Sequence, residues 1–349
     1  MARIVIASTR PDAGKTTLVV GLGKALSGKF GYCKPFGDRL MYKKKQLWDY
    51  DCALIVSLFA KEAAEHLVPM GFDQSKLRFM YGREAIEEKL KTMTAAAEAG
   101  HDVVFIEGGR DLAYGGFVYM DPVSVARITK SRLVLVVEGN ENKILDDVSF
   151  IKSHLDLQGV DFGGILVNKV PNVDDFKSTY LAEVESLGVP VLGAIPFEPA
   201  LTYLTADIIS QKIMAKVLSG EENLSNTVRH ILVGAMSAEA VLRHPLFTKE
   251  KILLITSGDR TDMLIAALEQ DVVAVILTNN VIPPAQILSK YSERGIPLLL
   301  TPHDTYTVAM DIHGIEPLLS KEDAPRIARI EQLVRDHVDL AAVLGKKKK

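Results

Sequence analysis

Gly14, Lys15 and Thr16 are the residues whose types and spacing are best suited to chemistry, and that chemistry is on phosphate. They follow the apolar run 4–7 and open an apolar-periodic stretch, so the pattern predicts a buried strand, a tight loop and a helix. Glycine lets the backbone approach a ligand, and unpaired N–H groups at a helix start hold anions. In such a loop the lysine reaches the β- and γ-phosphates, and the threonine hydroxyl ligates magnesium. The segment therefore predicts a nucleotide site.

The loop before these residues departs from the usual pattern, because Thr9 stands where a glycine is expected. The plainer alternative is a solvated lysine at a helix start. A cation at that end of a helix is unfavourable unless an anion offsets it, which favours the phosphate interpretation. We therefore expect the nucleotide to contact the loop and the helix start, namely Thr9, Ala13, Gly14, Lys15, Thr16 and Thr17.

Glu107 and Asp51 are candidate magnesium ligands beside Thr16. Glu107 follows the apolar strand predicted over 102–106 and precedes two glycines, which suits a carboxylate that binds metal or orients water near a γ-phosphate. A helix cap would not need the paired glycines. Asp51 introduces a predicted helix, and either Asp51 or Asp49 is expected to be its N-cap. A role for Asp51 on magnesium is the second possibility.

Lys34 precedes Pro35 and is expected to end a short strand over 31–34, because a residue before proline is pushed into extended geometry. Ligands of open parallel sheets bind at the carboxyl ends of the strands, so Lys34 and Lys15 are expected to face one cavity. The alternative is a surface lysine before a turn.

Length and composition place limits on the class of protein. With 349 residues, 48% of them apolar, and a net charge of −3, the chain can bury two cores and is not expected to bind nucleic acid. No apolar run approaches the ~20 residues of a membrane span, and no secretion signal is evident, so we expect a cytoplasmic protein. Cys33 and Cys52, the two cysteines, suit a reducing compartment. The lysine runs 43–45 and 346–349 are interpreted as a solvated face and a frayed terminus.

Strands and helices alternate along the whole chain, which predicts an α/β fold with doubly wound, mainly parallel sheets. A polar break over 218–223 predicts a P-loop domain over 1–218 and a smaller α/β domain over 224–345. Further strands are expected in the first domain at 132–137, 162–167 and 189–194, and in the second at 231–233, 251–256, 272–277 and 297–301.

Asn168 follows a predicted strand, where its amide is able to read an adenine edge, although an asparagine there is also an ordinary turn former. Pro196 and Glu198 lie in a proline-rich loop that is able to flank a base.

The second predicted domain has a polar segment over 256–262, just before a helix expected from Met263 to Leu268. Ser257 or Asp259 would cap that helix. Capping leaves Arg260 unexplained, so Asp259, Arg260 and Thr261 are candidates for a ligand site or an interface.

Together these motifs resemble the dethiobiotin synthetase family of P-loop enzymes joined to a domain similar to the DRTGG family. The same pairing resembles the N-terminal regulatory region of long phosphate acetyltransferases. The resemblance implies that Lys15 and Thr16 hold ATP and magnesium, and that Lys34 contacts a carbamate or carboxylate. It also implies a homodimer. The remaining implied roles are magnesium binding by Asp51 and Glu107, adenine recognition by Asn168, and a loop bordering the base at Pro196 and Glu198.

The sequence also departs from these families. Arg10 stands where related partitioning ATPases carry a second lysine, and it either offsets charge on the transferred phosphoryl group or points to solvent. Asp38 and Arg39 follow Lys34 where a small hydroxyl residue is usual. In the DRTGG block, residues 262–263 are Asp-Met where two glycines are usual.

The sequence thus predicts a cytoplasmic Mg-ATP protein that transfers the γ-phosphoryl group to water or to a small carboxylate or carbamate, with Arg10, Lys15 and Lys34 as catalytic residues. The alternative is a nucleotide-gated regulatory protein whose second domain binds a metabolite or partner. A phosphate acetyltransferase proper is not expected, because the resembling region is the accessory part of those enzymes.

Overall fold

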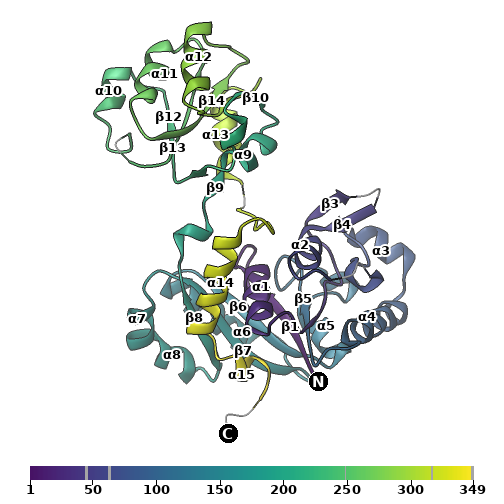
Figure 1. The fold of residues 1–349 in the computed structure, drawn as a ribbon. Helices are drawn as coiled ribbons and strands as arrows, with labels where there is room; N and C mark the ends of the chain where they lie inside the picture. Colours follow the sequence, from purple (N-terminus) through teal and green to yellow (C-terminus); the bar gives the residue numbers. More distant parts are fainter. Residues whose placement is uncertain (44–45, 62–63, 248, 316, 347–349) are drawn as a thin grey trace. The chain divides into compact units, whose positions relative to one another are not determined.

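A computed structural model describes residues 1–349 except 44–45, 62–63, 248, 316 and 347–349. Lys44, Lys45 and Lys347 to Lys349 of the two lysine runs therefore lie outside the described residues. The chain forms two compact units, Met1–Glu198 with Leu319–Lys349, and Pro199–Leu318 (Figure 1).

The first unit is built on a six-stranded sheet in which every pairing is parallel. Its strands, in spatial order, are β2 (Gly31–Cys33), β5 (Val103–Glu107), β1 (Ala2–Ser8), β6 (Arg132–Glu138), β7 (Asp161–Val170) and β8 (Val191–Pro196). The expected strands are all present, and the predicted α/β fold with a mainly parallel sheet is confirmed.

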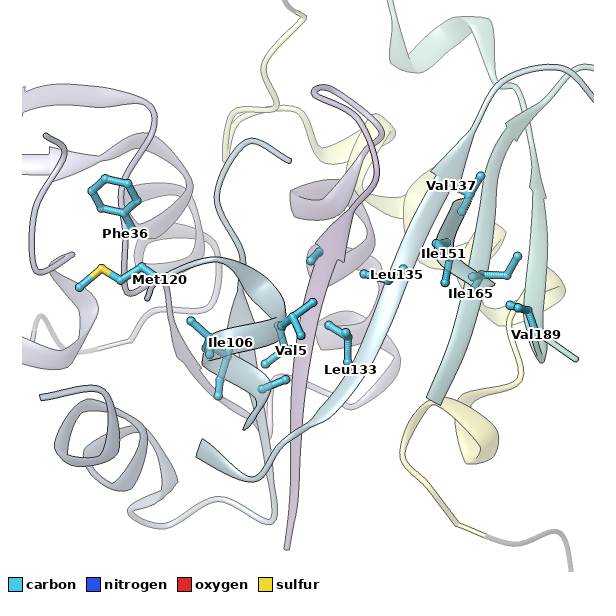
Figure 2. Close-up of a cluster of buried hydrophobic side chains, with 14 of the residues drawn as sticks. Val5, Phe36, Ile106, Met120, Leu133, Leu135, Val137, Ile151, Ile165 and Val189 are labelled. Atoms are coloured by element: carbon cyan, nitrogen blue, oxygen red, sulfur yellow. The ribbon is translucent and has the colours of Figure 1, made fainter. Parts of the chain in front are cut away.

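Helices follow most strands of this unit. They are α1 (Lys15–Ala25), α2 (Tyr50–Leu58), α3 (Gln74–Met80), α4 (Arg83–Glu98), α5 (Pro122–Thr129), α6 (Glu141–His154), α7 (Val173–Asp175), α8 (Leu181–Ser186), α14 (Ala324–His337) and α15 (Leu340–Val343), with a π-helical turn over Phe176–Tyr180. In a parallel sheet covered by helices, the side chains on both faces of each strand are buried. The strands are therefore nearly continuous apolar runs. Val5, Ile106 and Leu135 lie in the resulting core (Figure 2).

The strand register brings the chemically interesting residues to one edge of the sheet. Ile6 of β1 pairs with Glu107 at the end of β5, and Cys33 of β2 pairs with Ile106. Lys34, one residue beyond β2, therefore comes level with Glu107. The loop after Ser8 leaves the sheet at this same carboxyl edge.

A two-stranded hairpin, β3 (Leu40–Lys43) and β4 (Gln46–Asp49), lies between β2 and α2 and was not expected. For this stretch we expected a solvated lysine run and, at Asp49, a candidate N-cap of the following helix. The hairpin delivers Asp49 to the start of α2.

The second unit holds a five-stranded sheet with order β10, β15, β14, β13, β12. The parallel strands are β12 (His230–Val233), β13 (Ile252–Ser257), β14 (Val272–Thr278) and β15 (Leu298–Leu300), while β10 (Lys216–Ser219) is antiparallel at the edge. Its helices are α9 (Ala206–Lys212), α10 (Ala238–Leu242), α11 (Thr261–Leu268), α12 (Ala285–Glu293) and α13 (Thr305–His313), and a small sheet pairs β9 (Leu204–Thr205) with β11 (Thr227–Val228).

The compact units differ from the predicted domains 1–218 and 224–345 at both boundaries. Strand β10 lies where part of the polar break was expected, because Val217 and Ser219 pair with the edge of the second sheet. Helix α14 belongs to the first unit because it packs along α1. Its buried face includes Ile330 and Val334. None of the described helices has the length and apolarity needed to cross a bilayer.

Gly21 allows the close approach of α1 and α14. A Cβ atom at this position would lie 2.4 Å from Cγ2 of Val334 and 3.1 Å from Cγ2 of Ile330. We expect Gly21→Val to lower the free energy of unfolding of the first unit by about 1–3 kcal/mol, because overpacking forces side chains and backbone to move. Urea unfolding measures the change.

Gly116→Ala is the matched control, since no atom lies within 4 Å of the added Cβ. Adding Val334→Ala to Gly21→Val is expected to recover part of the loss. Unchanged stability of Gly21→Val would contradict the packing of α14 on α1.

Candidate functional site

The loop between β1 and α1 ends in a glycine whose conformation and surroundings exclude a side chain. Gly14, the residue before α1, has φ 94°, in the left-handed region that favours glycine. A Cβ there would lie 2.4 Å from Nδ2 of Asn168, so a side chain does not fit. No side chain caps α1, so the loop leaves its first N–H groups without a side-chain acceptor.

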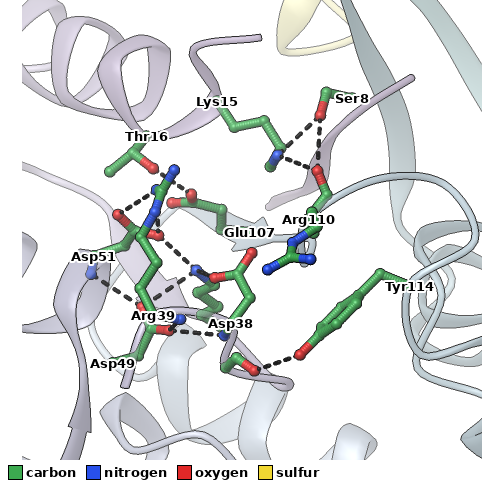
Figure 3. A network of polar contacts seen from close by, with 12 residues as sticks. Ser8, Lys15, Thr16, Asp38, Arg39, Asp49, Asp51, Glu107, Arg110 and Tyr114 are labelled. Carbon is green, nitrogen blue, oxygen red and sulfur yellow. Dashed lines mark hydrogen bonds and ion pairs between the residues drawn. The ribbon is translucent and has the colours of Figure 1, made fainter. Parts of the chain in front are cut away.

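Lys15 is a buried cation held by neutral oxygens. Its side chain lies behind the loop with a residue exposure of 8%, and Nζ donates to Ser8 Oγ at 2.8 Å and to the Arg110 carbonyl at 3.0 Å (Figure 3). Burial lowers the pKa of Lys15 despite nearby carboxylates such as Glu107. Neither oxygen carries a charge, so the site is suited to receive an anion.

Thr16, at the start of α1, and Glu107, at the end of β5, are joined by a hydrogen bond. The Thr16 hydroxyl donates to Glu107 Oε1 at 2.6 Å, and the Tyr32 hydroxyl donates to Oε2 at 2.9 Å. Burial and the neighbouring Asp51 raise the pKa of Glu107 to about 7. A hydroxyl and a carboxylate are oxygen ligands of the kind that Mg²⁺ takes beside nucleotide phosphates, so the residues fit the predicted ion.

Lys34 lies at the centre of three aspartates. Its Nζ is 2.5 Å from Asp38 Oδ1, 3.2 Å from Asp49 Oδ1 and 2.5 Å from Asp51 Oδ2. Burial opposes the charged lysine, but the carboxylates, Asp51 first, outweigh it and raise the pKa of Lys34. Burial likewise opposes charge on Asp51, while Lys34 and Arg39 lower its pKa. Both directions describe a charged ion pair between Lys34 and Asp51, whose side chains are 1% and 2% exposed.

Asp49 caps α2 and leaves Asp51 free for another role. The Asp49 carboxylate accepts the backbone N–H of Asp51 at 2.9 Å, and its other oxygen accepts N–H groups from the segment that leads into β3. Of the two aspartates considered as the N-cap, Asp49 is therefore the cap. The Asp51 side chain faces Lys34, Arg39 and the Thr16 hydroxyl.

Arg10 pairs with Asp147, which is not among the predicted site residues. Its guanidinium contacts Asp147 of α6, with Nη2 2.8 Å from Oδ1, and the Thr9 hydroxyl donates to Oδ2 of the same residue at 2.6 Å. Arg10 and Asp147 are 137 positions apart in the sequence, and no local spacing relates them. Neither alternative considered for Arg10 included this ion pair.

Asn168 and Glu198 also have protein partners. Asn168 Nδ2 donates to the Ala13 carbonyl at 2.8 Å and so supports the phosphate loop. Pro196 ends β8, and Glu198 accepts from Arg329 of α14 at 2.6 Å. Their predicted roles beside a base stay predictions.

In the second unit, the protein itself engages Arg260. Its Nη2 donates to the Met236 carbonyl at 2.8 Å, and Nε lies 3.1 Å from Asp262 Oδ1. Thr261 begins α11, two residues earlier than expected, and Asp259 is exposed. Capping of the helix did not explain an arginine at position 260, whereas these contacts within the second unit do. A ligand or interface role for the three residues stays a prediction.

The buried Glu107 gives the metal-free protein a distinctive pH dependence. Between the ordinary pKa of 4.5 and the folded value of about 7, the folded state keeps a proton that the unfolded state loses. This carboxyl therefore reduces stability as pH rises through that window. Without added metal, Glu107→Gln is expected to gain roughly 1–3 kcal/mol relative to the native protein between pH 4.5 and 8. Urea unfolding across pH measures this gain, Glu88→Gln is the exposed control, and a difference independent of pH would contradict the assignment.

Comparisons with known proteins agree with this architecture. Residues 2–205 match the family model described as AAA domain, and residues 208–315 match the DRTGG domain. The phosphate acetyltransferase of Nitrosomonas europaea is 21% identical over 366 residues, covering 97% of this chain and 50% of the relative. That of Pseudomonas aeruginosa is 23% identical over 381 residues, covering 97% and 51%. The chain thus spans about half the length of these relatives.

Among solved structures, the CBS and DRTGG domains of the regulatory region of Clostridium perfringens pyrophosphatase, complexed with its activator diadenosine tetraphosphate, are 26% identical to this chain. The match covers 35% of this chain and 50% of the other, with a TM-score of 0.29. The predicted pairing of a P-loop domain with a DRTGG domain, and the likeness to long phosphate acetyltransferases, are confirmed. The chain belongs to the AAA domain family through residues 2–205 and carries a DRTGG domain after them.

Proposed function

We propose that the first unit binds Mg-ATP at the carboxyl edge of its sheet and hydrolyses it. The observation that carries the proposal is the 2.6 Å hydrogen bond between Thr16 and Glu107, because it joins the hydroxyl after the loop lysine to an acid from a neighbouring strand. Magnesium bound there would offset negative charge on the phosphates. Thr16 and Glu107 would hold the ion.

The loop supplies the rest of a polyphosphate site. The backbone from Ala13 to Thr17 would hold the phosphates at the start of α1, where the helix dipole favours an anion. Lys15 would exchange its neutral partners for a phosphate oxygen. A charge-assisted hydrogen bond to phosphate is stronger than one to a hydroxyl, so the exchange is favourable.

Water is a better-supported phosphoryl acceptor than a small carboxylate or carbamate. Lys34 was predicted to position such an acceptor, but its side chain is 1% exposed and its ammonium contacts three aspartates. A carboxylate substrate would have to displace one of these buried partners. Removing one member of a buried ion pair is costly, which favours ATPase over ligase chemistry.

A nucleotide-gated regulatory protein is the second candidate. This regulatory function is favoured by the same enclosed Lys34, because its charge is already neutralised by aspartates and would not bind an acceptor substrate. The DRTGG match of the second unit also favours it. Acetyl transfer is named only for relatives about twice this length, and the described P-loop geometry supports a nucleotide role instead. A metabolite ligand for the second unit, a homodimer and a cytoplasmic location are retained as further proposals, from the resemblance and the composition.

Titration calorimetry with a non-hydrolysable ATP analogue and Mg²⁺ tests the binding. We expect Lys15→Ala to weaken binding by roughly 100-fold, because a buried charge-assisted contact to phosphate is lost. Lys29→Ala, an exposed lysine beyond α1, is the control and should bind like the native protein. Equal affinity of the native protein and Lys15→Ala would contradict the site.

Release of phosphate from Mg-ATP separates the two candidate functions. An ATPase is expected to show turnover that Glu107→Gln abolishes while the ATP analogue still binds. Tight binding by the native protein without turnover would overturn hydrolysis and favour the regulatory function.

A further inference from the structure

Arg39 connects the phosphate loop to the start of α2. Its Nη2 lies 3.1 Å from Asp12 Oδ1 in the loop, and its Nη1 lies 3.2 Å and 3.3 Å from the two oxygens of Asp51. Asp51 is also a neighbour of the Thr16 hydroxyl. Figure 3 shows the guanidinium beside Asp51, at the edge of the sheet where Thr16 and Glu107 meet. Arg39 is thus a cation next to the proposed metal and phosphate site.

The two carboxylates that hold Arg39 differ greatly in exposure. The Asp51 side chain is 2% exposed, whereas that of Asp12 is 59% exposed. A buried contact is retained strongly because its loss leaves an uncompensated charge, while an exposed pair is screened by water and contributes little. Of these two contacts, the one with Asp12 is therefore the easier for a ligand to replace.

A phosphate on the loop would favour this exchange. Asp12 lies two residues before Gly14 and has a positive φ of 59°, so its carboxylate is part of the same tight loop. Negative charge bound to the loop N–H groups would repel Asp12 and attract the guanidinium. The forked donors of arginine are able to keep Asp51 and to bind a phosphate oxygen at the same time.

Five other cations among the described residues lie at this edge. Lys169 contacts the Asp12 carbonyl and Glu138, and Arg110 has an exposed side chain. The remaining three have partners or positions that differ from those of Arg39. Arg10 contacts Asp147, whose side chain is 9% exposed, and Lys34 is enclosed by aspartates. Lys15 lies behind the loop and would reach the phosphates from that side. Resting on the proposed nucleotide binding, we propose that Arg39 binds the terminal phosphate and gives the site its preference for a nucleoside triphosphate over a diphosphate.

Calorimetry with Mg²⁺ and either the ATP analogue or ADP tests this role. Arg39→Ala is expected to weaken binding of the ATP analogue by roughly 10- to 100-fold while ADP affinity changes by less than about threefold, because charge-assisted hydrogen bonds to one phosphate are lost. Arg39→Lys, which keeps the charge but not the forked donors, should retain part of the preference. Arg83→Ala, an exposed arginine paired with Glu87 on α4, is the matched control and should behave like the native protein.

The outcomes distinguish this inference from the function on which it rests. Equal weakening of both nucleotides by Arg39→Ala, or no weakening, would overturn the role of Arg39 while leaving nucleotide binding intact. Failure of the native protein to bind either nucleotide would overturn both. If Arg39→Ala does not fold, as judged by its thermal unfolding transition, Arg39→Lys is the deciding variant. An unchanged ratio of its affinities for the ATP analogue and ADP overturns the role of Arg39. A reduced ratio supports it.

Discussion

Lys34, Asp49 and Asp51 are buried together, with the partly buried Asp38 beside them, and the rest of the site is arranged around that burial of charge. A charged group removed from water is stable only when partners and hydrogen bonds replace the water. Here Asp49 is fixed by backbone N–H groups at the start of α2, and it contacts Lys34 together with Asp38 and Asp51. The β3–β4 hairpin brings Asp49 to that position. Because each member needs the others, the network holds β2, the hairpin and α2 in fixed register beside the phosphate loop.

The same constraint explains the division of roles among the charged residues. Asp51 faces Lys34 on one side and Arg39 on the other, so it stays ionised in spite of its burial. Glu107 receives hydroxyl donors instead of a direct cation, and its pKa is raised. A carboxylate without a cationic partner is the one that gains most from a metal ion. For the magnesium ion that we propose, Glu107 is therefore a better-suited ligand than Asp51.

The sequence predicted the site residues that can be recognised from their neighbours along the chain. Gly14, Lys15 and Thr16 follow a strand, and Glu107 ends another, so the parallel register alone brings them together. Asp147 and Arg329 could not be predicted as the partners of Arg10 and Glu198, because these pairs join distant elements. Helix α14 has the same amphipathic pattern whichever unit it packs on, so its place against α1 depends on tertiary contacts. Strand β10 is a short edge strand, and its polar surroundings look like a linker.

The most direct test of this account is a crystal structure of the protein with Mg²⁺ and a non-hydrolysable ATP analogue. We expect the phosphates on the loop from Ala13 to Thr17, with the Lys15 ammonium moved from Ser8 and the Arg110 carbonyl onto a phosphate oxygen. Magnesium should contact the Thr16 hydroxyl on the side of Glu107. A nucleotide bound elsewhere, with Lys15 still on its two neutral partners, would contradict the central claim that this edge of the sheet is a nucleotide site.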